Sequence, residues 1–250
     1  MKKEHEPAQA TVEAAPAPRA PEGQTPHAVL ALQRTIGNRA VARALGIQRT
    51  PTQVSNLNRE DRSGGLGPIE WTSAYEVEFV GSECRLNINV CLVRDADVTE
   101  AQWNTVKAEA ESEFRRVWDN KFRLTESGTG STYNIRVGLT WVTSGEHVRI
   151  ALHQGRGGAN RRNWFVTPPH VVSRAHELGH QLGLIDEYVD AEVINRATAT
   201  SPGVFTDHSV MGNTYGEGAT RATAKLRHAQ RMAGHISTAT GRTFTGSLVP

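Results

Sequence analysis

The chain has 250 residues, a formal net charge of +2 and an isoelectric point near 8.7. Its Lys and Arg residues are scattered, without a dense basic run or interleaved aromatic residues, so no nucleic-acid-binding surface is expected. No segment approaches the roughly 18 consecutive apolar residues that span a bilayer, so no membrane span is expected either.

The first 67 residues are expected to form a tail and not a domain. Residues 1–26 are rich in Ala, Pro, Glu and Gln and lack apolar periodicity, which predicts disorder. In residues 27–46 apolar side chains recur at mixed helical spacing, which predicts a short amphipathic helical segment. Residues 47–70 are again polar, with Gly and Pro, and are typical of a linker. We therefore expect a single folded domain that comprises residues 68–250.

Apolar patterns in this domain predict both strands and helices. A helix that starts near Thr99 is predicted because its apolar residues lie on one stripe. A second helix is predicted after Pro168 and Pro169, and a last one that ends at Gly241. The predicted strands are residues 75–80, 86–90, 133–142 and 147–153, and the first and last helices are residues 98–119 and 220–239. This order of elements predicts an α+β fold.

The two cysteines, Cys84 and Cys91, fall on one predicted strand. An odd separation along a strand places two side chains on opposite faces, too far apart for a disulfide. We therefore expect two free thiols and no disulfide scaffold.

The second helix carries the motif with the most specific chemistry, HELGHQLGLID, which begins at His176. His176 and His180 are four residues apart, so their imidazoles lie on the same helix face and form a chelating pair. Gly183 tolerates the positive φ at which a helix ends, so the chain can turn back and bring Asp186 to the pair. Two neutral nitrogens, one anionic oxygen and an open position suit a catalytic Zn²⁺ ion.

Glu177 lies about 100° round the helix from His176, beside the expected metal and not on it. There it would act first as general base toward a water molecule and then as general acid toward the leaving amine. The alternative interpretation is a chance pair of surface histidines, because the bare H-E-x-x-H pattern occurs in roughly a few per cent of chains this long.

Other residues near the motif leave alternatives open. Glu187 follows Asp186 directly, and it would either replace Asp186 as third ligand or orient a histidine from behind. His208 and His228 are reserve ligands, although such histidines are more often solvated or structurally bonded. Tyr188 is expected to pack beside the site or to support a metal ligand from behind, and not to be catalytic.

The segment HELGHQLGLIDEY resembles the metzincin signature H-E-x-x-H-x-x-G-x-x-H, with Asp186 in place of the last His as in snapalysin-type peptidases. The residues around Met211, Ser-Val-Met-Gly, resemble the Met-turn that lies as an apolar floor beneath the metal. The resemblance implies a zincin-like fold with a twisted mixed sheet, an active-site helix and a C-terminal helix. It also implies a zinc metalloendopeptidase of proteins or peptides, in which Tyr215 would hydrogen-bond the developing oxyanion.

The tail segment LQRTIGNRAVARAL resembles a segment of bacterial proteins encoded with extracellular contractile injection systems. That resemblance implies an injected effector or toxin that binds the injection particle through this segment. The other interpretation is a helix that docks on its own domain and masks the cleft as a pro-segment. Residues 1–7 are not followed by the apolar run of a secretory signal, so we expect synthesis in the bacterial cytoplasm and delivery by a non-classical route.

Two rival functions fit the same motif. A catalytically silent binding or cargo protein would keep the metal site and dock a partner. A metal-dependent hydrolase of a non-peptide amide would use the same residues on a different substrate.

Overall fold

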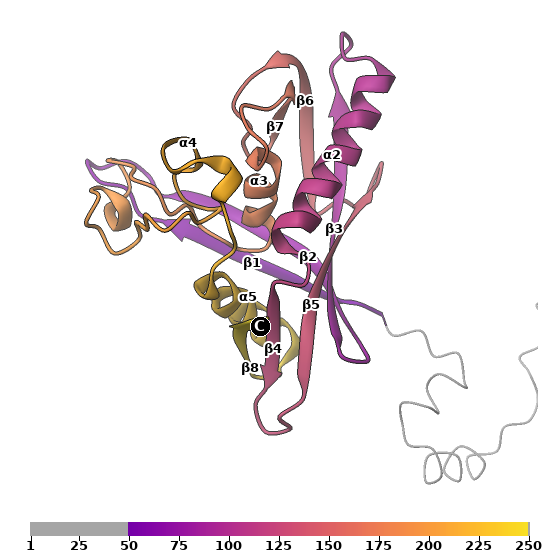
Figure 1. The fold of residues 1–250 in the computed structure, drawn as a ribbon, viewed down its shortest axis with the longest axis vertical. Coiled ribbons are helices and arrows are strands. Elements are labelled where there is room, and N and C mark those ends of the chain that lie inside the picture. Colours follow the sequence, from indigo (N-terminus) through magenta and orange to yellow (C-terminus); the bar gives the residue numbers. More distant parts are fainter. Residues whose placement is uncertain (1–49, 250) are drawn as a thin grey trace, which may run out of the picture. The chain divides into compact units, whose positions relative to one another are not determined.

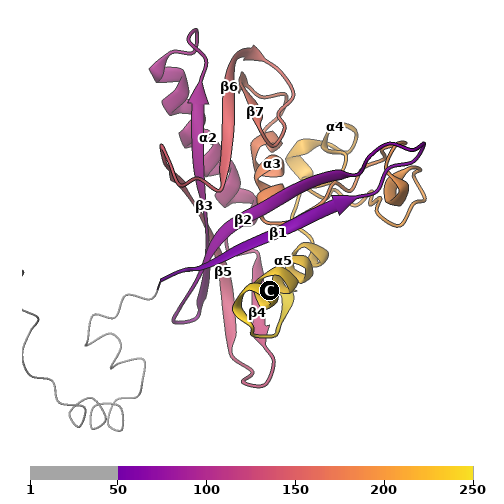
Figure 2. The same ribbon diagram turned by 180° about the vertical axis from the view of Figure 1, so that it is seen from behind.

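The computed structural model describes residues 50–249. In this part of the chain an eight-stranded mixed sheet is combined with helices, so the expected α+β class is confirmed (Figures 1 and 2). The strands are β1 (Thr52–Glu60), β2 (Ile69–Val80), β3 (Glu83–Arg94), β4 (Phe122–Glu126), β5 (Thr132–Trp141), β6 (Val148–Arg156), β7 (Asn163–Thr167) and β8 (Phe244–Leu248). The helices are α2 (Glu100–Trp118), α3 (Ser173–Gln181), α4 (Thr214–Glu217) and α5 (Leu226–Thr240), with 3₁₀ turns η1 (Ile194–Arg196) and η2 (Ala219–Arg221). No helix within residues 50–249 is long and apolar enough to cross a membrane.

Strand β3 organises the sheet because it pairs with three other strands. Its first half pairs antiparallel with β2 and parallel with β5, and from Val90 onward it pairs parallel with β6. Val90 is the partner of Trp141 on β5 and of Val148 on β6, so β6 takes over the edge of β3 that β2 leaves. The outer half of β2 continues in a long hairpin with β1, which both views show (Figures 1 and 2).

Local sequence signals predict several of these elements correctly. Helix α2 starts after Thr99, whose hydroxyl accepts a hydrogen bond from the Gln102 N–H at 3.2 Å. Its buried residues form the expected stripe, which packs on β5. Helix α5 ends at Gly241, where φ is +66°. Cys84 and Cys91 are both free and buried on β3.

The boundary expected at residue 68 is wrong, because the segment assigned to the linker contains β1. All of β1 pairs antiparallel with β2, and its Val54 is fully buried. The polar residues that suggested a linker are buried too: Asn58 is 3% exposed and Glu60 is 8% exposed. Their polarity is satisfied by distant partners that a local pattern does not contain. The amphipathic segment expected at residues 27–46 lies outside the described residues.

Strands β4 and β8 were not predicted, and they form the opposite end of the sheet. β4 pairs antiparallel with β5 on one side and with β8 on the other. Each has only five residues, too few for an alternating pattern to stand out from its neighbours. Helix α5 packs against β8, β4 and β1, so the chain's last helix and strand close the core.

Helix α3, which carries the motif, begins at Ser173, later than its two prolines suggest. Two buried side chains fix it against α2 and β7. The indole of Trp118 donates a hydrogen bond to the Ala175 carbonyl at 2.9 Å. The fully buried guanidinium of Arg174 binds Glu109 at 2.8 Å and the carbonyls of residues 165 and 166. These contacts make α3 a rigid support for the histidines.

A variant that begins at Thr50 is expected to fold, whereas one that begins at Gly67 is expected to be unstable. The shorter variant lacks β1, so the outer half of β2 loses its strand partner and buried Arg196 loses Glu60. Removing one member of a buried ion pair costs about 3–5 kcal/mol, a large share of a typical domain's stability. Thermal unfolding followed by circular dichroism tests both variants. Equal midpoints would contradict the inclusion of β1 in the core.

Candidate metal centre

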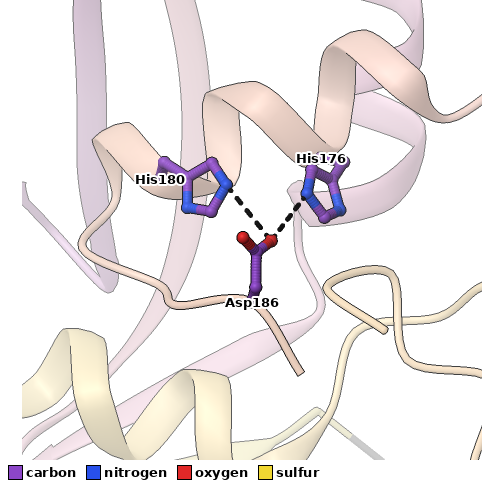
Figure 3. A group of neighbouring side chains, drawn as sticks. All are labelled: His176, His180 and Asp186. Carbon is purple, nitrogen blue, oxygen red and sulfur yellow. Dashed lines mark ion pairs between the residues drawn. The ribbon is translucent and has the colours of Figure 1, made fainter. Parts of the chain in front are cut away.

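The structure brings His176, His180 and Asp186 together, as the spacing of the motif predicts. The histidines project from successive turns of α3, and Asp186 returns toward them from the segment after the helix (Figure 3). Asp186 Oδ1 lies 3.0 Å from His176 Nε2 and 3.4 Å from His180 Nε2. One candidate ligand atom from each residue lies within 4.8 Å of the others.

Backbone carbonyls hold both imidazoles in one tautomer. His176 Nδ1 lies 2.8 Å from the Val210 carbonyl, and His180 Nδ1 lies 2.9 Å from the Leu184 carbonyl. A carbonyl only accepts hydrogen bonds, so each Nδ1 must carry the hydrogen. In the neutral rings each Nε2 therefore presents its lone pair toward Asp186 Oδ1, which is the arrangement of metal-binding histidines.

The second carboxylate oxygen of Asp186, Oδ2, is bound by residues that do not belong to the cluster. The Tyr188 hydroxyl donates a hydrogen bond to Asp186 Oδ2 at 3.1 Å, and Arg196 Nη2 lies 3.6 Å from the same oxygen. Arg196 is 2% exposed and is itself paired with Glu60 of β1, at 2.7 and 3.2 Å. The sequence predicts a packing or ligand-supporting role for Tyr188, and the hydrogen bond to Asp186 is of the second kind. Sequence analysis did not single out Arg196 or Glu60. Glu60 precedes Arg196 by 136 positions, so no local pattern connects them.

At this cluster, burial and the neighbouring opposite charges shift the pKa values of His176 and Asp186 in opposite directions. Burial disfavours the charged imidazolium of His176, but the hydrogen bond and negative charge of Asp186 outweigh it and raise the pKa of His176 to about 9. Burial alone would raise the pKa of Asp186, yet the two histidines hold it well below its usual range. Asp186 is therefore an anion at neutral pH, and a positive charge beside it is strongly stabilised.

The donor set fits a zinc ion. Asp186 Oδ1 is buried and has no hydrogen-bond partner among the described residues, so it faces two nitrogen lone pairs whenever the histidines are neutral. A cation among the three atoms removes that repulsion. Zinc bonds of about 2.0–2.2 Å in a tetrahedral site separate neighbouring ligand atoms by about 3.3–3.6 Å. The two separations from Asp186 Oδ1, 3.0 and 3.4 Å, are close to that range.

Glu177 lies beside this cluster and lines two cavities. Its carboxylate oxygens are 4.0 Å from the Nε2 atoms of His176 and His180. One cavity, of about 260 Å³, is also lined by His170, Thr214 and Tyr215. The other, of about 270 Å³, includes Asp186 and Arg161. Burial raises the pKa of Glu177, which favours its ability to take up a proton.

Met211 lies beneath the helix that carries the histidines. It is fully buried, and a Cβ added to Gly179 would come within 2.7 Å of its sulfur. The preceding residue, Val210, supplies the carbonyl that holds His176. The segment around Met211 thus packs against α3 and orients one histidine, whereas its expected role as an apolar floor beneath a metal stays a prediction.

The alternative ligands lie elsewhere. Glu187 is 4% exposed and binds the Arg227 guanidinium at 2.6 and 2.7 Å, and Ser209 Oγ donates to it. His228 Nε2 lies 3.2 Å from the same carboxylate. Hydrogen bonds from Arg227 and His228 outweigh burial and lower the pKa of Glu187 to about 2. His208 lies beside Glu217, so neither it nor His228 joins the cluster.

Tyr215 lies at the rim of the smaller cavity and not at the cluster. It is 70% exposed, and its ring meets the His170 ring edge-on with centroids 4.5 Å apart. No hydrogen bond of its hydroxyl is found within residues 50–249, so its expected role toward an oxyanion stays a prediction. His170, which sequence analysis did not single out, is held by Ser173 and Thr214 and lines the same cavity.

Comparison with known proteins identifies no similar protein. No protein-family model, curated protein or solved structure matches this chain.

Gly183→Ala is expected to destabilise the protein more than the matched control Gly241→Ala. Both glycines have positive φ, +86° and +66°, so alanine is strained at either position. At Gly183 the new Cβ would also lie 2.1 Å from the His235 ring, whereas at Gly241 it meets nothing within 4 Å. We expect losses of about 2–4 kcal/mol and about 1 kcal/mol, respectively, in urea unfolding. Equal losses would mean that Gly183 is required only for its backbone conformation.

Asp186→Ala and Glu187→Ala are expected to separate metal binding from stability. The first should weaken zinc binding by more than the roughly 10- to 100-fold that loss of a supporting residue causes. The second should retain zinc but lower the free energy of unfolding by about 1–3 kcal/mol, because it removes a buried carboxylate and leaves Arg227 with Asp207 alone and His228 Nε2 with Ser209 alone. Zinc titration of both folded variants gives the comparison. Loss of zinc in Glu187→Ala alone would move the third ligand to Glu187.

Proposed function

We propose that the protein is a zinc-dependent endopeptidase that hydrolyses protein or peptide substrates. One observation carries the proposal: Nε2 of His176, Nε2 of His180 and Oδ1 of Asp186 converge, and each imidazole is fixed by a backbone carbonyl. These three residues would hold the ion. Zinc bound there would supply a Lewis acid that polarises the scissile carbonyl and lowers the pKa of a water molecule.

Glu177 is the proposed general base and acid. Its carboxylate lies 4.0 Å from both candidate nitrogen ligands, and no side chain of the described residues hydrogen-bonds to it. It is therefore placed beside the ligands and open to the two cavities that it lines. In the proposed reaction a Glu177 oxygen takes a proton from the attacking water and passes it to the leaving amine.

The two cavities favour cleavage within a chain. They lie next to Glu177 and share His176 and Tyr188 in their walls, so a substrate could occupy both at once. An endopeptidase needs space for residues before and after the scissile bond, and a peptide that runs through both cavities meets that need. The resemblance of residues 176–188 and of the segment around Met211 to metzincins supports the same reaction.

Glu177→Gln is expected to keep zinc and to lower kcat by roughly 10²–10⁴-fold, because the amide neither accepts nor returns a proton. The matched control is Glu111→Gln, the same change on the exposed face of α2. Zinc content and cleavage of a diverse peptide library are measured for both proteins and for the unaltered chain. Near-normal turnover by Glu177→Gln would exclude the proposed role of Glu177.

The same assay separates the rival functions. Zinc-loaded protein that cleaves no peptide would favour a binding protein. Cleavage of peptidoglycan-derived amides without cleavage of the library would favour a hydrolase of non-peptide amides.

A further inference from the structure

A larger cavity adjoins the candidate metal centre. Its volume is about 910 Å³, and it is lined by β2, by the start of β6, by residues 160–163 and by the end of α3. We name it the arginine groove after Arg149, Arg161 and Arg162, which line it together with Trp71 and Gln181. Gln181 directly follows His180 in the chain, so the groove starts beside the candidate zinc ligands.

The charges of the groove are unevenly compensated. Arg149 is paired with Glu146 at 2.6 Å, and the groove's carboxylate, Glu70, is paired with Arg59 at 3.2 Å. Arg161, in contrast, makes no ion pair and no side-chain hydrogen bond with any residue from 50 to 249, and its Nη1 is buried without a partner. Its guanidinium lies 4.6 Å from the centre of the Trp71 ring, which holds it in place. Arg161 is therefore a positively charged group that is held in the groove and has no counterion among the described residues.

Arg161 also lines the cavity that contains the candidate metal centre. That cavity includes Glu177 and Asp186, so Arg161 stands at the junction between it and the arginine groove. A substrate that occupies both cavities would therefore lie beside the guanidinium. Neither carboxylate lies within ion-pair distance of Arg161, so they do not occupy its hydrogen-bonding groups.

A second unpartnered group faces the same groove. Gln181 is 5% exposed, and its buried side-chain oxygen has no hydrogen-bond partner in the described part of the chain. Buried donors and acceptors without partners are unfavourable, so both Arg161 and Gln181 gain free energy from a polar ligand.

We infer that the arginine groove binds a carboxylate of the peptide substrate through Arg161, and that the protein selects acidic peptides. Planar guanidinium groups match carboxylates in two-pronged hydrogen bonds, and Gln181 can bond the peptide backbone beside that carboxylate. The carboxylate comes from a Glu or Asp side chain or from a peptide C-terminus. A groove of this volume has room for several residues, which favours a side chain. The inference deepens the proposed peptidase function and rests on it.

Two peptide series test the inference. In one series a single Glu steps through successive positions of a short labelled peptide, and in the other Gln replaces it. Each peptide is made with a free or an amidated C-terminus, which separates the two sources of the carboxylate. Cleavage is measured with zinc-loaded protein, and binding is measured by fluorescence polarisation with the Glu177→Gln protein. The unaltered chain should prefer Glu over Gln at one position, or the free acid over the amide, by roughly 10- to 100-fold in kcat/KM.

Arg161→Gln should abolish this preference in both cleavage and binding. The matched control is Arg156→Gln, which removes the same charge from an exposed position near the other end of the β6–β7 connection. An equal loss of rate on all peptides in Arg161→Gln, with the preference intact, would overturn the inference. So would the absence of any preference in the unaltered chain. Carboxylate-dependent binding without cleavage of any peptide would support the groove and contradict the peptidase proposal.

Discussion

The candidate metal centre depends on one constraint: both oxygens of the largely buried Asp186 carboxylate need a compensating group. Oδ2 has the Tyr188 hydroxyl and the nearby Arg196 guanidinium. Oδ1 has two imidazole nitrogens, each of which offers a lone pair when neutral because its ring hydrogen is given to a carbonyl. The positive charge that Oδ1 requires must therefore come from a proton or a cation. Arg196 is buried in turn and requires Glu60, so the same constraint makes β1 part of the site.

Two adjacent carboxylates, Asp186 and Glu187, have different roles in the site. Asp186 faces the histidines, while Glu187 faces away and binds Arg227, His228 and Ser209. The Glu187 N–H also donates to the Met211 carbonyl at 2.8 Å. Glu187 thus ties the segment around Met211 to α5, and that segment supports α3 and orients His176. One step in the chain thus separates the carboxylate that faces the histidines from the one that holds the surrounding segments together.

How much of this could be predicted from the sequence depends on how far apart the interacting residues are. The i, i+4 histidines, the turn at Gly183 and the cap at Thr99 are local features, and all lie where their spacing predicts. The spacing also favoured Asp186 over Glu187 as the residue near the histidines. Strand β1 was missed because Asn58 and Glu60 look solvent-exposed until Ser73 and Arg196 are known to face them. The sequence did not single out Arg161 for a related reason: its lack of a partner follows from three-dimensional packing and not from neighbouring residues in the chain.

The difference between Arg196 and Arg161 would link binding of the proposed zinc ion to binding of the proposed acidic substrate. Arg196 is neutralised by Glu60, whereas Arg161 has no ion pair among the described residues and is offset mainly by the more distant negative charges of Glu177 and Asp186. A divalent cation at the proposed site would balance those two carboxylates and leave the charge of Arg161 uncompensated. An acidic substrate would then be attracted more strongly to the metal-loaded protein than to the metal-free protein. Because coupling between two binding sites is reciprocal, a carboxylate bound at Arg161 would increase the affinity of the histidines and Asp186 for the cation. The arginine groove and the metal centre would in that case act as one charge-balanced unit.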